Sequence, residues 1–197
     1  MSSKARNSRR LTATSLAPVA ERLTRSVVQV LSGPGGGAGV AWAPGFVVTN
    51  AHVTRAKDVA LVLPDGSRVR GRVSAWDARR DLALIRAPVE LPSCGTGDPR
   101  LRAGALVFAV GHPLGVTQAV CAGVFQALGK LPAGLRLPRL DPQLDWIQAD
   151  LRLAPGNSGG PIADAEGRVI GISAMILGGL GLGVPSPEIE AFVKANR

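Results

Sequence analysis

Apolar residues occur along most of the chain in short runs, and glycine, proline and aspartate separate one run from the next. Several runs alternate apolar with polar positions at a period of two, as strands with one buried face do. Arg68, Arg70 and Arg72 follow this period, with Val69 and Val73 at opposite positions, so these arginines are expected together on one face of a strand. We predict strands over residues 26–32, 40–42, 46–49, 59–63, 68–74, 82–85, 105–110, 119–128, 145–148, 161–163, 169–175 and 182–184.

Glycine and proline mark the connections between these strands. The Pro-Asp-Gly sequence at 64–66 predicts a hairpin turn, and the glycine-rich run 33–37 is also predicted as a turn. Residues 18–25 can form a short helix. Ser186-Pro187-Glu188 predicts the start of a second helix, with Ser186 as its cap and Glu188 near the positive end of the helix dipole.

A segment rich in glycine at 95–104 divides the strands into two sets. The fold class is therefore predicted as all-β, with paired small antiparallel barrels, a short N-terminal helix and a C-terminal helix. We expect a flexible basic arm over 1–17 and a single domain over 18–197. Within that domain the first barrel is expected at about 26–96, the second at about 103–186 and the helix at 187–196.

Composition places the chain of 197 residues among globular proteins, because 46% of residues are hydrophobic and only 19% are charged. The net charge of +9 raises the question of a nucleic-acid partner. However, the positive residues are spread over the N-terminal arm, the 68–72 strand face and several loops, without interleaved aromatic residues. No nucleic-acid partner is expected.

Two uncharged stretches, 103–129 and 169–187, are long enough to raise the question of a membrane span, but glycine and proline break both of them. We expect buried strands there and no membrane span. The N-terminal 20 residues hold four basic and no acidic residues and make a poor secretory signal, so a cytoplasmic location is expected. Export to the cell envelope through an atypical N-terminal signal remains the alternative.

The two cysteines, Cys94 and Cys121, fit a reducing compartment and show no metal-ligand spacing. Buried free thiols are favoured, and a disulfide between the two cysteines is the alternative. The sequence also lacks a phosphate loop, an EF-hand or a zinc signature. We therefore expect no cofactor and no metal.

Candidate chemistry centres on the run Gly156-Asn157-Ser158-Gly159-Gly160-Pro161. A serine between glycines allows backbone amides to face a developing oxyanion, and Gly156 and Ser158 would supply those N–H groups. A serine nucleophile also needs a neutral imidazole, which His52 offers directly after an apolar strand. Taken alone, a Gly-Asn-Ser-Gly run is more often a loop without catalytic function, and a single histidine is more often a structural residue.

The third group needed is a carboxylate that orients the imidazole. Asp81 enters the apolar strand 82–85 and is expected to be partly buried, whereas Asp58, Asp65 and Asp77 lack that setting. The order His52, Asp81, Ser158 puts two groups in the first strand set and one in the second. That order predicts a catalytic site in a cleft between two barrels.

With these residues in place, the chain resembles the chymotrypsin-fold serine proteases and, within them, the protease domain of the HtrA (Deg) family. The resemblance implies two six-stranded antiparallel β-barrels and a serine endopeptidase that cleaves exposed or unfolded polypeptide through an acyl-enzyme. It implies His52 as general base, Asp81 as its orienting carboxylate, Ser158 as nucleophile, and the Gly156 and Ser158 amides as oxyanion hole. The matching motifs lie at 37–40, 46–53, 63–66, 81–85, 111–115, 148–150, 155–161 and 184–186.

Substrate preference is implied by the same match. Digestive trypsin-like enzymes carry aspartates where this chain has Arg152 and Asn157, so neither their preference for basic residues nor their activation by an ion-paired new N-terminus is expected. The HtrA pattern instead places Leu153, Leu177 and Leu180 around the specificity pocket, which implies an aliphatic side chain at the cleavage site. The alternative, that these are ordinary core leucines, stays open.

The resemblance further implies that residues 174–176, with Ala174 and Ile176, pair with the substrate backbone as an added strand. The glycine-rich segment after Leu177 is shorter than is usual in the family, and no PDZ domain follows residue 186 in this sequence. Peptide sensing by such a domain is therefore not expected within the chain. His112 is not expected to be catalytic, and a homo-oligomer is left open.

One alternative belongs to another functional class: a non-catalytic peptide-binding or chaperone-like module that uses the same cleft. The complete set of Ser158, His52 and Asp81 argues against this alternative, because a protein that has lost catalytic activity usually lacks one of its catalytic residues.

Overall fold

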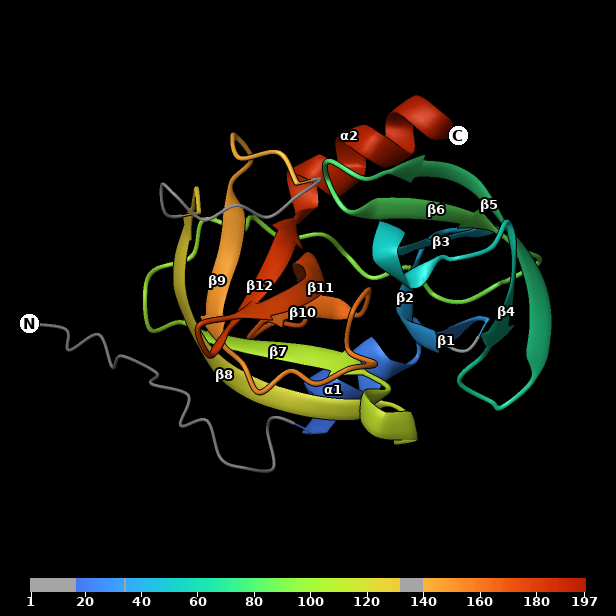
Figure 1. Cartoon of the computed structure of the whole chain (residues 1–197). Coiled ribbons are helices and arrows are strands. Elements are labelled where there is room, and N and C mark those ends of the chain that lie inside the picture. Colours follow the sequence, from blue (N-terminus) through green and yellow to red (C-terminus); the bar gives the residue numbers. More distant parts are fainter. Residues whose placement is uncertain (1–16, 34, 132–139) are drawn as a thin grey trace, which may run out of the picture.

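The computed structural model describes residues 17–33, 35–131 and 140–197. It contains two closed six-stranded antiparallel barrels that lie side by side (Figure 1). The predicted all-β fold class, with two six-stranded barrels and a helix at each end, is confirmed. The expected arm lies outside the described residues, apart from Ala17, which belongs to the first helix.

The first barrel has the strand order β1-β2-β3-β6-β5-β4. The second repeats this order, because its neighbours run β7-β8-β9-β12-β11-β10 around the barrel. The strands of the first barrel are β1 (Val27–Ser32), β2 (Gly35–Ala43), β3 (Phe46–Thr49), β4 (Asp58–Val62), β5 (Arg68–Asp77) and β6 (Leu82–Arg86). Those of the second are β7 (Leu106–Gly111), β8 (Ala119–Gly129), β9 (Trp146–Asp150), β10 (Pro161–Asp164), β11 (Val169–Leu177) and β12 (Leu180–Pro185).

Two helices flank the barrels, α1 (Ala17–Thr24) and α2 (Ser186–Asn196), and two short 3₁₀ turns lie near their junction, η2 (Ala51–Val53) and η3 (Pro113–Gly115). The α2 helix buries Ile189, Phe192 and Val193 in one apolar cluster. That cluster also holds Leu84 of the first barrel and Trp146 of the second. The core is thus continuous across the junction, which fixes the two barrels relative to each other (Figure 1).

The arginine stripe of β5 is confirmed, since Arg68, Arg70 and Arg72 are all exposed on one face of the strand. The hairpin turn at 64–66 is also confirmed, and Gly66 adopts the left-handed conformation there with φ +84°. Both features depend only on local pattern, so the sequence was sufficient to predict them.

The prediction of a turn over 33–37 is wrong for its last three residues, because β2 begins at Gly35 and pairs with β1. A Cβ atom at Gly36 would lie 2.4 Å from the carbonyl oxygen of Val30, and one at Gly37 would lie 2.6 Å from that of Ser158. The glycines are therefore needed for the close approach of neighbouring backbones rather than for a change of direction.

The prediction of Ser186 as a helix cap is also wrong. Pro185 occupies the cap position, and the hydroxyl of Ser186 instead donates to the carbonyl oxygen of Gly97 at 2.8 Å. This bond ties the start of α2 to the segment that joins the barrels. Across the part of the chain that the structure describes, no helix is long and apolar enough to cross a bilayer. Cys94 and Cys121 are free and half-buried.

Candidate active site

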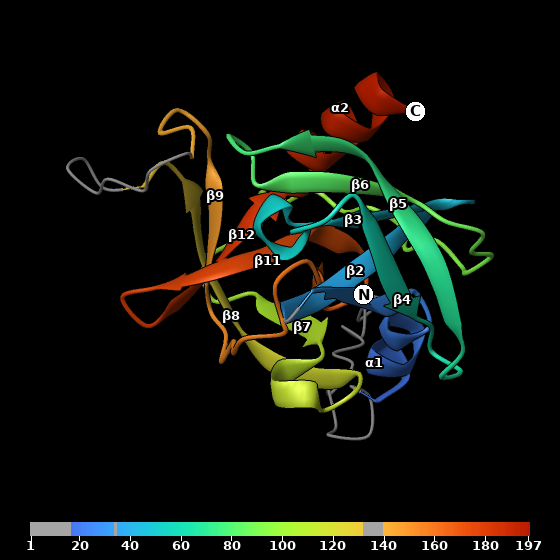
Figure 2. The ribbon, with the colours of Figure 1, turned by 45° about the vertical axis from the view of Figure 1, so that its right-hand side comes forward.

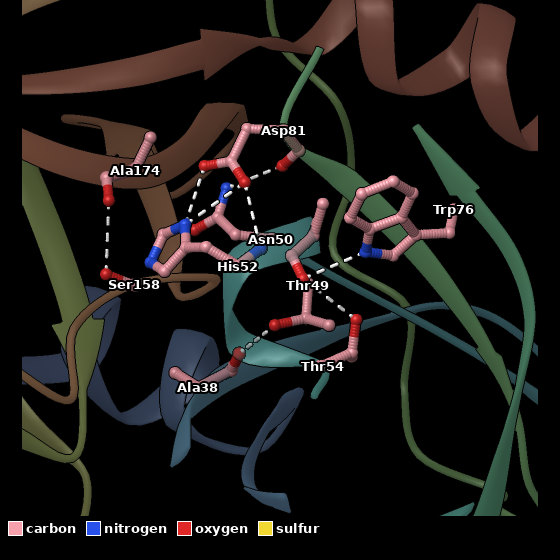
Figure 3. A network of polar contacts seen from close by, with 10 residues as sticks. Ala38, Thr49, Asn50, His52, Thr54, Trp76, Asp81, Ser158 and Ala174 are labelled. Atoms are coloured by element: carbon pink, nitrogen blue, oxygen red, sulfur yellow. Dashed lines mark hydrogen bonds and ion pairs between the residues drawn. The ribbon is translucent and has the colours of Figure 1, made fainter. Parts of the chain in front are cut away.

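His52 and Asp81 are brought together at the junction of the barrels (Figure 3). The η2 turn carries His52 directly after β3, and Asp81 precedes β6, which pairs with β3. The His52 Nδ1 atom lies 2.8 Å from Asp81 Oδ2, and the His52 backbone N–H donates to Oδ1 at 3.0 Å. The Asp81 side chain is buried while that of His52 is 49% exposed, so one edge of the ring is held and the rest faces solvent.

Asp81 has φ +55°, a left-handed backbone conformation that is unfavourable for a residue with a side chain. The buried Asn50 supports this conformation, because its Nδ2 donates to the carbonyl oxygen of Asp81 at 3.0 Å. Sequence reasoning missed this role of Asn50. The available signal was an amide side chain at the end of an apolar strand, two residues before the candidate histidine.

The η2 turn is itself held in place by contacts to the carbonyl oxygen of Ala51. The indole N–H of Trp76 and the hydroxyl of Thr54 both donate to this oxygen at 3.0 Å (Figure 3). The hydroxyl of Thr49, just before the turn, donates to the carbonyl oxygen of Ala38 at 2.7 Å. These bonds connect the turn to β5 and β2 and restrict the position of His52.

Ser158 lies in the 151–160 loop between β9 and β10, on the side of the imidazole away from Asp81 (Figure 3). Its hydroxyl donates to the carbonyl oxygen of Ala174 at 3.1 Å. Its own carbonyl oxygen accepts from the Ala38 N–H of the first barrel at 2.8 Å. The loop therefore contacts both barrels, and Ser158 faces the same junction as His52 and Asp81.

The glycines around Ser158 adopt backbone conformations that other residues avoid. Gly156 has φ +108° and Gly159 has φ +85°, and a Cβ atom at either position would lie within 2.2 Å of a backbone oxygen. Within the described residues, the backbone N–H groups of Gly156 and Ser158 donate to no protein acceptor. These two N–H groups are available to an oxyanion, and their role as the oxyanion hole stays a prediction.

His112 lies against this loop, although it is not one of the predicted catalytic residues. Its backbone N–H donates to the carbonyl oxygen of Gly156 at 3.0 Å, and its Nδ1 accepts from the Gln118 N–H at 3.3 Å. Burial lowers the pKa of the His112 imidazole, which favours the neutral ring. The segment around His112 therefore positions Gly156 through the backbone. The presence of a histidine in the sequence does not by itself predict this structural role.

The three leucines predicted around the specificity pocket are half-buried. Leu153 lies over the backbone of β12, since a Cβ atom at Gly181 would be 2.9 Å from Leu153 Cδ1. Leu177 pairs with Leu180 across the β11–β12 hairpin. Leu153 and Leu177 also pack against apolar core clusters, so the structure is compatible with both a pocket wall and a core role. Arg152 is exposed.

The end of β11 offers an open edge beside Ser158. β10 pairs with β11 only as far as Ile172, and the Gly159 and Gly160 backbone then bonds to Ser173. Ala174 is a bulge in the pairing with β12, which turns its carbonyl oxygen to the Ser158 hydroxyl. Beyond it, Ile176 is half-exposed, and no strand among the described residues pairs with this edge.

Comparison with known proteins gives the family. The trypsin-like peptidase domain family matches residues 37–172. The putative serine protease HhoB of Synechocystis sp. is 39% identical over 147 residues, which are 72% of this chain and 35% of the relative. The human serine protease HTRA4 is 34% identical over 154 residues, which are 76% of this chain and 32% of the relative.

Among solved structures, the HtrA-type protease AlgW with a tripeptide superimposes with a TM-score of 0.83 and 29% identity. The match covers 91% of this chain and 62% of that one. The chain spans about a third of the length of these curated relatives, in the region of their protease domain. The chain therefore belongs to the trypsin-like peptidase family, and its relatives are serine proteases of the HtrA type.

Proposed function

We propose that this chain is a serine endopeptidase that cleaves exposed or unfolded polypeptide through an acyl-enzyme. The observation that carries the proposal is the buried Asp81 carboxylate, which binds Nδ1 of a half-exposed His52 at 2.8 Å while Ser158 faces the same junction. Membership of the trypsin-like peptidase family supports it.

In the proposed mechanism, the Nδ1–H of His52 donates a hydrogen bond to the Asp81 carboxylate, so that Nε2 carries the lone pair. The second bond to Asp81, from the His52 backbone N–H, fixes the carboxylate relative to the turn. The Ser158 hydroxyl, which donates to Ala174 in the free protein, rotates about its Cα–Cβ bond to donate to Nε2.

The Ser158 oxygen then attacks the substrate carbonyl carbon, and its proton passes to Nε2. The N–H groups of Gly156 and Ser158 stabilise the negative oxygen of the tetrahedral intermediate. When this intermediate collapses, the carbon–nitrogen bond breaks and Nε2 gives its proton to the leaving amine. Water hydrolyses the resulting ester by the same steps, which releases a carboxylate and restores the serine.

The substrate is expected to bind as an added strand along the open edge of β11, with its backbone beside Ala174 and Ile176. Leu153, Leu177 and Leu180 would then contact the side chain before the scissile bond and favour a small or medium aliphatic residue. The HtrA-type protease AlgW, to which this chain is similar, is solved with a tripeptide, which supports a peptide as the substrate class. A homo-oligomer is compatible with this proposal but is not required by it.

A fluorophosphonate probe tests the nucleophile, because it forms a covalent bond only with an activated serine. We expect the purified chain to be labelled and to digest casein, and Ser158→Ala to do neither. Ser93→Ala, which changes an exposed serine outside the site, should behave as wild type. Absence of labelling and of cleavage in the wild type would refute the proposal and favour the non-catalytic peptide-binding module.

A peptide library tests the aliphatic preference separately. Cleavage should occur mainly after small or medium aliphatic residues, and dominant cleavage after arginine or lysine would contradict the assignment of the three leucines. The core alternative for these leucines predicts a different result for Leu180→Ala: lower stability without a change in which residues are accepted.

A further inference from the structure

A cavity of about 570 Å³ opens beside His52. Residues of the first barrel line one wall, with Leu31, Gly35 and Arg55 among them. The other wall comes from His112 to Gly115 after β7 and from the start of the Ser158 loop. Neither β11 nor the three pocket leucines contribute to the lining. Figure 2 shows the adjoining ends of β1 and β2, the 151–160 loop and η3 close to one another.

The position of this cavity relative to His52 determines which part of a substrate would enter it, given the proposed function. The acyl half of the substrate occupies the β11 edge, and the leaving amine receives its proton from His52 Nε2. The chain that follows the scissile bond must therefore begin beside His52 and continue away from β11. The cavity borders His52 and has no residue of β11 in its described lining, as expected of a site for that part of the substrate.

Among the described residues that line the cavity, Arg55 is the only Lys, Arg, Asp or Glu. It forms no ion pair with any residue in the described ranges. Its backbone N–H donates to Ser32 Oγ at 2.7 Å, and its guanidinium lies over Gly35, where an added Cβ atom would be 3.8 Å from Cζ. The Arg55 side chain is therefore anchored at its backbone and available at its head group, in a cavity whose described lining holds no acidic side chain.

The distance from Ser158 to the Arg55 guanidinium can be estimated from the residue spacing along β2. A Cβ atom at Gly37 would touch the Ser158 carbonyl oxygen, and Gly35 lies two residues further on the same face of the strand. Two residues of an extended chain span about 7 Å, in β2 and in a bound peptide alike. The guanidinium thus lies within reach of the first two residues after the scissile bond.

An apolar side chain completes the wall. Leu114 is 83% exposed although it is large and hydrophobic, and η3 holds it with φ +51°, a conformation that leucine rarely adopts. Leu31, which is half-buried, lines the same cavity. A strained, exposed leucine that lines the same cavity as Arg55, on the other wall, is typical of a binding surface rather than of a core.

We infer that this cavity binds the leaving peptide of the substrate, and that Arg55 selects a carboxylate within the first two residues after the scissile bond. This inference rests on the proposed function. The carboxylate can come from an aspartate or glutamate side chain or from the free C-terminus of a short leaving peptide, because a guanidinium binds both in the same way. The neutral His112 in the wall adds no competing charge.

Quenched fluorescent peptides with one constant acyl half test the inference. Each pair differs by aspartate against asparagine at the first, second or fourth residue after the scissile bond. We expect wild-type kcat/KM to favour aspartate about three- to tenfold at one of the first two positions and not at the fourth. Arg55→Gln should abolish the preference, and Arg55→Glu should replace it by a preference for lysine. Arg70→Gln, which removes an exposed arginine on the outer face of β5, should retain it.

A second pair of peptides separates the two sources of the carboxylate. These peptides end two residues after the scissile bond, with a free carboxylate or an amide at the C-terminus, and carry no acidic side chain there. A higher kcat/KM for the free acid that depends on Arg55 assigns the chain terminus, and equal values assign the acidic side chain. Added salt should reduce either preference, since the pair is exposed.

The inference is overturned if wild type shows no preference in either series, or if Arg55→Gln keeps it. Binding of labelled product-side peptides to Ser158→Ala, measured by anisotropy, distinguishes this failure from that of the proposed function. Carboxylate-selective binding through Arg55 without any hydrolysis would refute the proteolytic function alone. Hydrolysis without carboxylate selection would refute the inference alone.

Discussion

Gly37→Ala is expected to damage both stability and activity, because Gly37 lies where the two barrels touch. An alanine Cβ atom there would be 2.6 Å from the Ser158 carbonyl oxygen and 2.9 Å from Val53 Cγ2, whereas ordinary contacts lie at 3.4–4 Å. The next residue, Ala38, donates its N–H to the same oxygen at 2.8 Å. The carbonyl therefore cannot turn aside without loss of a hydrogen bond between the barrels.

The size of the effect follows from this geometry. Overpacking of a rigid site by one methyl group costs about 1–3 kcal/mol of the free energy of unfolding. For a chain of this size that loss lowers Tm by about 2–12 °C. The atoms that must move are the Ser158 backbone and Val53, the residue after His52. A displacement of the nucleophile by most of an ångström lowers kcat/KM by about 100-fold.

Thermal unfolding and peptide hydrolysis measure the two effects. Gly35→Ala is the matched control for stability, because its Cβ atom would meet only the Arg55 side chain at 3.8 Å, an ordinary contact. Gly95→Ala, with open space around the new methyl group, is the control for activity. If Gly37→Ala unfolds at the wild-type temperature and keeps kcat/KM within about twofold, the close approach of the two backbones is not what requires glycine here.

Trp76→Phe removes the indole N–H that donates to the Ala51 carbonyl oxygen but keeps an aromatic side chain. We expect the free energy of unfolding to fall by about 0.5–1.5 kcal/mol and kcat to decrease. An unchanged kcat would show that this hydrogen bond does not position the η2 turn. Burial raises the pKa of Asp77, but hydrogen bonds from Arg80 and from the Arg79 backbone, with the charge of Arg80, together outweigh this and lower the pKa below 3.8. The stability from this pair is thus present above about pH 3.8 and lost as pH falls through the folded-state pKa, so the deficit of Arg80→Gln in urea unfolding should shrink in that range. Burial lowers the pKa of His112 below 6.5, so as pH falls the unfolded chain binds a proton at this residue before the folded chain does. The free energy of unfolding of wild type should therefore decrease more steeply from pH 7 to pH 5 than that of His112→Gln. An equal pH dependence of the two proteins would contradict a buried neutral ring.

The candidate catalytic residues could be predicted because each stands in a distinctive local pattern. His52 follows an apolar strand, Asp81 precedes one, and Ser158 lies among glycines. Strand periodicity and the glycine-rich boundary likewise predicted two sets of strands and the exposed arginine face of β5. These features depend on a few neighbouring residues, so reading the chain locally was sufficient for them.

Other parts of the site depend on residues that are distant in sequence. Asn50 supports the strained Asp81 backbone from 31 residues away, and His112 bonds to Gly156 across the second barrel. Composition predicts a turn at Gly36 and Gly37 because it shows that a side chain is absent, but not what would occupy its place. That space is filled by backbone atoms of Val30 and Ser158.

The amino-acid sequence by itself determined which residues could do chemistry and how many strands would carry them. Only the tertiary structure decided that Ser158 donates to Ala174, that the β11 edge is open, and that Arg55 lies in a cavity beside His52. The physical reason is that periodicity records which face of a strand is buried, whereas a cleft is made by the packing of one barrel against another. That packing depends on side-chain volumes and backbone approaches that no single segment contains.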